Sequence, residues 1–129
     1  MSEANVALVK SLYEAVGRQD RAAIFAVVDP GILIRQTELL PWGGQYQGIE
    51  GLQAFFGKLF ANVESQLATE QFLDAGNDVV MIGRTSGRTK ANGMHFDITA
   101  IHVWAVREGK IVGFYPYIDT PEMLKVLAA

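Results

Sequence analysis

Cysteine is absent from the 129-residue sequence, which excludes disulfide bonds, thiolate nucleophiles and cysteine-ligated zinc or iron–sulfur sites. No uninterrupted apolar run approaches the roughly 20 residues that a membrane-spanning helix needs. Neither charge sign dominates: 11 basic and 14 acidic residues give a net charge of -3, which provides no electrostatic basis for binding nucleic acid. Residues 1–5 show no basic region followed by an apolar block, so we expect no signal peptide and a cytoplasmic protein.

Several motifs of common enzyme classes are also missing. The sequence has no Gly-x-Ser-x-Gly elbow, no phosphate-binding loop and no dinucleotide fingerprint. Its two histidines, His95 and His102, are an odd number of positions apart on one expected strand, so their side chains should point to opposite faces. They cannot share a metal ion, and we predict neither a metal site nor a cofactor.

Half of the residues are hydrophobic and 19% are charged, which is typical of a globular protein, and the length suits a single domain over residues 1–129. Helical periodicity predicts helices at about 6–16, 21–28, 49–63 and 120–127. Alternating patterns separated by turn residues predict strands at 32–37, 66–75, 79–89, 94–106 and 111–118. Helices followed by antiparallel hairpins indicate the α+β class, with helices packed on one face of a curved sheet that forms a cone.

A glycine-rich stretch, residues 40–48, holds Trp42 and Tyr46 and runs directly into the third helical pattern. We expect a loop that sets these two aromatic side chains at the mouth of a pocket. Flat apolar rings with a polar tip are common in small-molecule sites. The alternative is that both rings close the wide end of the cone and bind nothing.

Alternation along strand 94–106 separates its side chains into two sets. The bulkier and more aromatic set, which we assign to the interior, comprises Phe96, Ile98, Ala100, His102, Trp104 and Val106. Burial there would lower the pKa of His102 and keep the imidazole neutral near pH 7, so that it could transfer a proton or hydrogen-bond a ligand carbonyl. A core histidine satisfied by a polar neighbour is the alternative.

The opposite face of this strand is half apolar, with Thr99, Ile101, Val103 and Ala105, and we expect it to form a homodimer through the sheet. Arg35, on the first expected strand, could anchor a charged group of a substrate. The alternative for Arg35 is a surface ion pair with Glu38.

Three motifs follow one another along the chain: Tyr13-Glu14-Ala15 through Asp20, Gly43–Gly48 into Leu52 and Phe56, and His102-Val103-Trp104 through Arg107–Ile111 to Tyr117-Ile118-Asp119. Taken in this order, they resemble the nuclear transport factor 2-like superfamily and especially its SnoaL-like branch. The resemblance implies a cone-shaped barrel of a strongly curved, mostly antiparallel sheet wrapped around three N-terminal helices. It also implies a deep hydrophobic pocket, and the superfamily is commonly dimeric.

In the ketosteroid isomerases of this superfamily, a helix tyrosine and a strand acid stabilise an oxyanion while an aspartate acts as the base. The tyrosine position matches Leu12 here, with Tyr13 one place off its face, and the base position matches Arg35 or Gln36. The strand position matches His102. Without a carboxylate base the resemblance does not support that mechanism. Polyketide cyclase-like chemistry needs mainly an inward-facing acid–base group, which His102 could supply.

These observations favour a protein that binds a small hydrophobic molecule. If it is an enzyme, we expect proton transfer on a carbonyl compound, as in cyclisation or isomerisation, with His102 moving the proton and Arg35 or Tyr46 stabilising the enolate. The alternatives are a non-catalytic ligand-binding module and a structural dimerisation domain with a plugged cavity. The residues expected to line the pocket are Trp42, Tyr46, Phe96, His102, Trp104 and Phe114.

Overall fold

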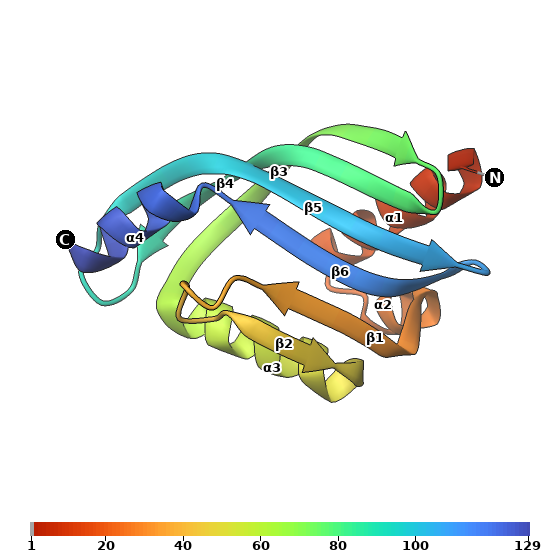
Figure 1. The fold of residues 1–129 in the computed structure, drawn as a ribbon, viewed down its shortest axis with the longest axis horizontal. Helices are drawn as coiled ribbons and strands as arrows, with labels where there is room; N and C mark the ends of the chain where they lie inside the picture. The colour runs from red at the N-terminus through yellow and green to blue at the C-terminus, as the bar shows by residue number, and fades with distance from the viewer. Residues whose placement is uncertain (1) are drawn as a thin grey trace.

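The computed structural model describes residues 2–129, and within them it contains four helices and six strands (Figure 1). The helices are α1 (Ser2–Gly17), α2 (Arg21–Val27), α3 (Gly48–Asn62) and α4 (Thr120–Ala128). The strands are β1 (Val28–Gln36), β2 (Gly44–Gln47), β3 (Val63–Ala75), β4 (Asp78–Thr89), β5 (His95–Arg107) and β6 (Lys110–Ile118).

The six strands form one sheet in the order β2-β1-β6-β5-β4-β3. Strands β1 and β6 pair in parallel, and all other neighbours are antiparallel. The α+β class, the mostly antiparallel sheet and the three amino-terminal helices are therefore confirmed. The sheet is open, because β2 and β3 end it at opposite edges, so the cone is not a closed barrel. Long, curved strands give it this shape (Figure 1).

Local signals in the sequence explain most element boundaries. Helix α2 begins after Asp20, whose carboxylate accepts a hydrogen bond from the amide of Ala23, and Asp119 caps α4 in the same way. Between β5 and β6, Glu108 and Gly109 both adopt positive φ angles, of 52° and 73°. This is the backbone of a two-residue turn whose twist matches that of a hairpin.

Two predictions about the segment before α3 are wrong. The first strand begins at Val28 instead of residue 32, because the chain leaves α2 directly in extended conformation and Val28 pairs with Ile111 of β6. The Asp29-Pro30-Gly31 stretch interrupts the register between β1 and β6 instead of separating helix from strand. Residues Gly44–Gln47, expected to be part of a loop, form the edge strand β2, since pairing with β1 satisfies their backbone groups.

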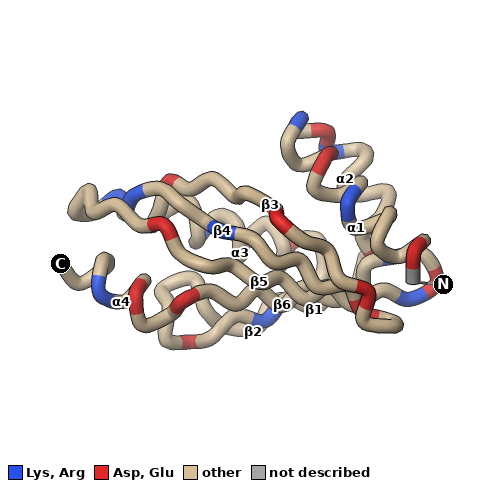
Figure 2. The backbone as a smooth tube through the Cα atoms, turned by 90° about the horizontal axis from the view of Figure 1, so that it is seen from above, with Lys and Arg blue, Asp and Glu red and all other residues tan. Residues whose placement is uncertain are grey.

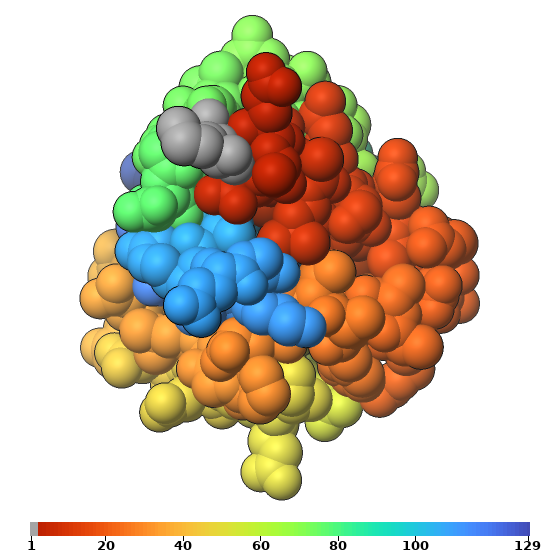
Figure 3. Space-filling model, turned by 90° about the vertical axis from the view of Figure 1, so that its right-hand side faces the viewer, coloured from red at the N-terminus to blue at the C-terminus, as the bar shows by residue number. Residues whose placement is uncertain are grey.

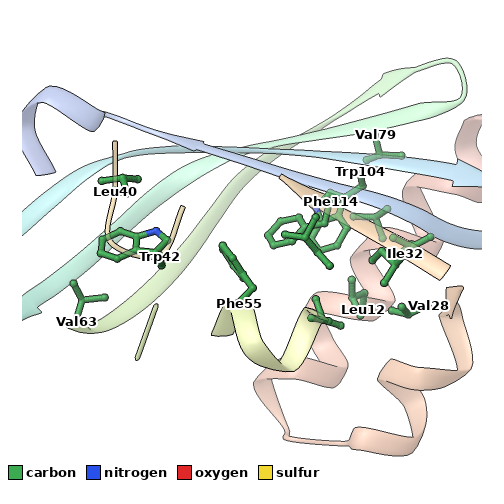
Figure 4. Close-up of a cluster of buried hydrophobic side chains, with 14 of the residues drawn as sticks. Leu12, Val28, Ile32, Leu40, Trp42, Phe55, Val63, Val79, Trp104 and Phe114 are labelled. Atoms are coloured by element: carbon green, nitrogen blue, oxygen red, sulfur yellow. The ribbon is translucent and has the colours of Figure 1, made fainter. Parts of the chain in front are cut away.

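Helices α1 and α2 lie together on one side of the sheet, and acidic and basic positions are interspersed along the backbone (Figure 2). Figure 3 shows α1, in red, beside the green turn between β3 and β4 and above the blue turn between β5 and β6. The core lies between the helices and the inner face of the sheet. In Figure 4, Trp42 and Val63 lie at one end of this core, Leu12 and Phe114 lie toward the other, and Phe55 lies between them.

Candidate functional site

A cavity of about 270 Å³ lies between α1, α3 and the inner face of the sheet. No Asp, Glu, Lys or Arg is among its lining residues in the described part of the chain, so the walls are mainly aliphatic and aromatic. Its polar lining groups come from Tyr13, Gln36, Ser65, Thr85, His102 and Trp104. A cavity of this composition suits a neutral, largely apolar compound that carries a few polar atoms.

Three large apolar side chains of the lining are also exposed to solvent and mark the rim of the cavity. Val16 near the end of α1 is 54% exposed, Phe60 near the end of α3 is 46% exposed, and Leu67 on β3 is 38% exposed. Exposing such side chains side by side costs hydrophobic free energy that a bound apolar molecule would recover. Trp42 is 2% exposed and lies in the wall, so the mouth is not at the glycine-rich segment where we expected it.

The polar centre of the cavity wall consists of Tyr13, His102 and Trp104. The indole Nε1–H of Trp104 donates a hydrogen bond of 2.8 Å to the hydroxyl oxygen of Tyr13. The same hydroxyl lies 2.7 Å from Nδ1 of His102. These contacts join α1 to β5 across 91 and 89 residues of sequence, and they fix the imidazole at the wall of a mainly apolar cavity.

Strand geometry and ring packing position this trio. His102 and Trp104 are two residues apart on β5, so both point to the inner face. The Phe114 ring stacks on Trp104 with centroids 4.2 Å apart, and its centroid is 5.2 Å from that of His102. The Tyr13 ring meets Trp104 edge-on. Aromatic contacts of this kind hold each ring in one orientation without any charged partner.

Burial keeps both titratable groups of the trio uncharged near neutral pH. Removal of the imidazole from water lowers the pKa of His102 from 6.5 to about 4. Burial also raises the pKa of the Tyr13 phenol well above its usual value, and this outweighs the smaller lowering caused by the hydrogen bond from Trp104. A neutral imidazole beside a neutral phenol can form hydrogen bonds to a ligand carbonyl, but it carries no charge to attract an ion.

Gln36 is a second polar group in the cavity wall and is 8% exposed. Its side-chain Oε1 accepts a hydrogen bond of 3.0 Å from the backbone N–H of Thr37. Because that N–H can only donate, the contact identifies which end of the amide is the oxygen. The amide nitrogen is the end left for other partners.

Five of the seven residues predicted for the site line the cavity: Trp42, Phe96, His102, Trp104 and Phe114. Arg35 and Tyr46 do not. Arg35 is exposed on β1, and its guanidinium lies 4.8 Å from the centre of the Tyr115 ring. The Tyr46 hydroxyl donates to backbone carbonyls at the start of the glycine-rich segment, at 3.0 and 3.2 Å, which secures this segment instead of reaching into the cavity.

Sequence reasoning missed two groups of the site, Tyr13 and Gln36. The available signal for Tyr13 was its place on the apolar face of α1. The comparison with the ketosteroid isomerases instead matched their tyrosine position to Leu12 and set Tyr13 one position off that face. Both Leu12 and Tyr13 line the cavity, because adjacent helical residues are about 100° apart and a wide cavity accommodates both directions. Gln36 was one of two candidate positions on β1, and strand alternation points it inward while Arg35 points outward.

Among residues 2–129, no group of three or more His, Asp or Glu side chains is arranged to hold a metal ion. Within the same range, no helix is both long and apolar enough to cross a membrane. The outer face of β5 has Thr99 exposed and Ile101 and Val103 half-buried, and the homodimer expected there stays a prediction.

Comparison with known proteins places these features in context. A family model described as a SnoaL-like domain matches residues 9–114. An NTF2-like protein of unknown function from Burkholderia pseudomallei is 27% identical, with 98% of each chain covered and a TM-score of 0.86. An NTF2-like protein from Burkholderia thailandensis is 29% identical, with 95% of each chain covered and a TM-score of 0.85.

A protein from Jannaschia sp. assigned as a SnoaL-like polyketide cyclase shares the fold, with 20% identity, 99% of this chain and 94% of that chain covered, and a TM-score of 0.84. No curated protein matches the sequence. The shared architecture therefore extends over nearly the whole chain.

Proposed function

This chain belongs to the SnoaL-like domain family, and on that basis we propose that it binds a small hydrophobic carbonyl compound in the cavity beside His102. The observation that carries the proposal is the neutral Tyr13–His102–Trp104 trio in the wall of an apolar cavity. Filling the apolar cavity with an apolar molecule lowers the free energy, because apolar surface that includes the exposed Phe60 and Leu67 at the rim is then removed from water.

As an enzyme, the protein would catalyse proton transfer on such a compound, as in a cyclisation or isomerisation. Contact between the carbonyl oxygen and the trio would stabilise the negative charge that develops when a neighbouring C–H bond breaks, and the proton would pass to a basic oxygen of the compound itself, since no described lining residue carries a carboxylate. The low dielectric of the cavity would strengthen that contact. Polyketide cyclase-like neighbours of the same fold are compatible with this reaction class.

A non-catalytic ligand-binding module is the second candidate. It is favoured by one specific observation: no described residue that lines the cavity carries a carboxylate able to serve as a general base. In this case the trio would hold the carbonyl compound without changing it. The two candidates differ only in whether the bound compound is recovered chemically altered.

Native mass spectrometry of freshly purified protein, followed by denaturing extraction, tests the proposal. We expect an apolar carbonyl compound bound at a fixed ratio to the chain. Intrinsic fluorescence gives a second readout, because the two tryptophans of the sequence, Trp42 and Trp104, both line the cavity. Titration with the apolar ketone 1-tetralone should therefore change the emission directly.

A matched pair of variants locates the binding site. Phe60→Ala removes an exposed ring from the rim of the cavity, whereas Phe25→Ala removes an exposed ring from α2, outside the cavity lining. We expect weaker 1-tetralone binding in the first variant and unchanged binding in the second. An empty protein whose fluorescence does not respond to 1-tetralone would contradict the proposal and favour a dimerisation domain without a usable cavity.

The proposal also includes a homodimer formed through the outer face of the sheet. Apolar side chains on that face support it, with Tyr117 59% exposed and Ile101 and Val103 half-buried beside it. Sedimentation equilibrium measures the mass directly, and Ile101→Asp should convert a dimer to a monomer. A monomer at all concentrations of the unmodified protein would contradict this part of the proposal.

A further inference from the structure

We propose that Tyr13 and Trp104 hold His102 in the tautomer that carries its proton on Nε2, so that the imidazole donates a hydrogen bond to the ligand and does not act as a base. The ligand part of this inference rests on the proposed function. The tautomer itself does not, because it follows from hydrogen bonds within the chain.

The direction of the hydrogen bonds follows from the chemistry of the indole. Trp104 Nε1–H is a donor only, so the Tyr13 oxygen accepts at 2.8 Å. The Tyr13 proton must then point elsewhere, and Nδ1 of His102, at 2.7 Å, is the partner that the structure gives it. Nδ1 therefore accepts and is unprotonated. A neutral imidazole with a bare Nδ1 carries its hydrogen on Nε2.

The opposite tautomer of His102 leaves one hydrogen-bond donor of the trio without a partner. If Nδ1 carried the hydrogen, the Tyr13 oxygen would have to accept from both His102 and Trp104. The phenol proton would then have no partner among the described side chains. Leaving a buried donor unpaired is unfavourable enough to shift the tautomer ratio by roughly tenfold or more. Hydrogen bonds that run in one direction, from Trp104 to Tyr13 to His102, also strengthen one another.

The donor on Nε2 opens to the cavity. Among residues 2–129, no buried side-chain nitrogen or oxygen lacks a hydrogen-bond partner. His102 has a hydrogen-bond partner at Nδ1 and none at Nε2, so Nε2 is not enclosed by protein atoms and faces the cavity that His102 lines. A ligand in the cavity therefore meets the N–H edge of the ring.

Gln36 adds a second donor of fixed orientation. Its Oε1 is engaged by the Thr37 N–H, so the amide nitrogen is the free end, and Gln36 lines the same cavity. The hydroxyls of Ser65 and Thr85 can donate or accept hydrogen bonds, so they discriminate little between donor and acceptor groups of a ligand. The two oriented groups both donate, and none of the described lining residues carries a carboxylate that could accept. The cavity therefore selects compounds whose polar atoms are acceptors, namely ketone, quinone or enolate oxygens.

This assignment changes the role available to His102. With Nδ1 occupied by Tyr13 and hydrogen on Nε2, the ring has no free lone pair to take a proton from carbon. It acts on the carbonyl oxygen as a neutral hydrogen-bond donor. Tyr13 is then a positioning residue, since it determines which nitrogen of His102 faces the ligand.

Two-bond 1H–15N correlation spectra of 15N-labelled protein at pH 7 test the tautomer without any ligand. His95→Gln identifies the His102 signals, because only two histidines are present. We expect the Nε2 shift in the protonated range and the Nδ1 shift in the unprotonated range. The reverse pattern, or two averaged intermediate shifts, would overturn the proposal.

Variants separate positioning from stability. Tyr13→Phe should abolish the fixed pattern and give averaged His102 shifts, whereas Tyr46→Phe, the same change at a tyrosine outside the cavity lining, should leave them as in the unmodified protein. Unchanged His102 shifts in Tyr13→Phe would show that Tyr13 does not set the tautomer.

A matched pair of probes tests the ligand class. 1-Tetralone and tetralin differ by one carbonyl group, and the ketone should bind roughly tenfold more tightly, which Gln36→Leu should reduce. Equal binding would refute selection for acceptors. If neither probe binds, the proposed function fails, and the nitrogen shifts still decide the tautomer.

Discussion

Acidification from about pH 7.5 to pH 5 should destabilise this protein through His102. The imidazole has a pKa of 6.5 when unfolded and about 4 when folded, because burial disfavours the charged ring. Protonation would also place a second donor against Tyr13, whose oxygen already accepts from Trp104. Below pH 6.5 the unfolded chain therefore binds a proton at His102 that the folded chain does not bind. The stability that the neutral imidazole contributes is complete above this pH and is lost as the pH falls toward 4.

The magnitude follows from the difference between the two pKa values. Each pH unit between them costs about 1.4 kcal/mol of unfolding free energy, so the step from 6.5 to 5 costs about 2 kcal/mol. Urea unfolding followed by tryptophan fluorescence at both pH values measures this loss. Carboxylates also titrate in acid. The contribution of His102 is therefore found by comparing the pH-dependent change in unfolding free energy between the unmodified protein and His102→Asn. The asparagine keeps an acceptor for Tyr13.

His95→Asn is the matched control, since His95 is exposed on the same strand. We expect His95→Asn to lose as much unfolding free energy on acidification as the unmodified protein. His102→Asn should lose about 2 kcal/mol less unfolding free energy between the two pH values. If His102→Asn does not fold, NMR titration of His102 in the unmodified protein gives the same information. A midpoint near 6.5, or equal pH dependence in both variants, would refute the argument from burial.

Three further predictions concern the framework of the site, and urea unfolding measures each of them. Asn92→Ala should cost about 1–3 kcal/mol, because the Asn92 amide donates to two carbonyl oxygens at the end of α4, and no loss would contradict that role. Gly57→Ala on the exposed side of α3 should stabilise by about 0.5–1 kcal/mol, whereas Gly83→Ala should destabilise, since its methyl group would overlap the Ala68 carbonyl. Tyr46→Phe should lower the unfolding free energy by about 1 kcal/mol and leave 1-tetralone binding unchanged. Weaker binding would show that Tyr46 contributes to the ligand site.

The sequence predicted the inner face of β5 because strand alternation has a fixed period of two. Phe96, Ile98 and Ala100 are buried as expected, and His102 and Trp104 follow on the same face. No bulge interrupts this register before His102, since the shift occurs only between Ala105 and Val106. A periodic pattern on one strand was enough to assign the imidazole to the interior.

Other parts of the site depend on contacts between distant segments, which periodicity does not encode. Tyr13 reaches His102 only because α1 docks against the sheet at one particular height and rotation. Strand β2 forms because β1 offers it a partner, and glycine-rich residues carry little strand propensity of their own. Whether Arg35 or Gln36 points inward depends on a single residue of register, which a one-residue error reverses.

The strand order β2-β1-β6-β5-β4-β3 has a consequence for synthesis on the ribosome. The first described strand, β1, needs β6, the last of the described strands, as its inner neighbour, with Ile34 beside Phe114. Until that partner emerges, β1 and β2 have no larger sheet to join, and the Phe55 and Phe56 rings of α3 lack their contact with Phe114. Nascent chains halted before residue 110 lack β6, and they should therefore be sensitive to protease and bound by chaperones, with the cavity forming only after β6 has left the ribosome.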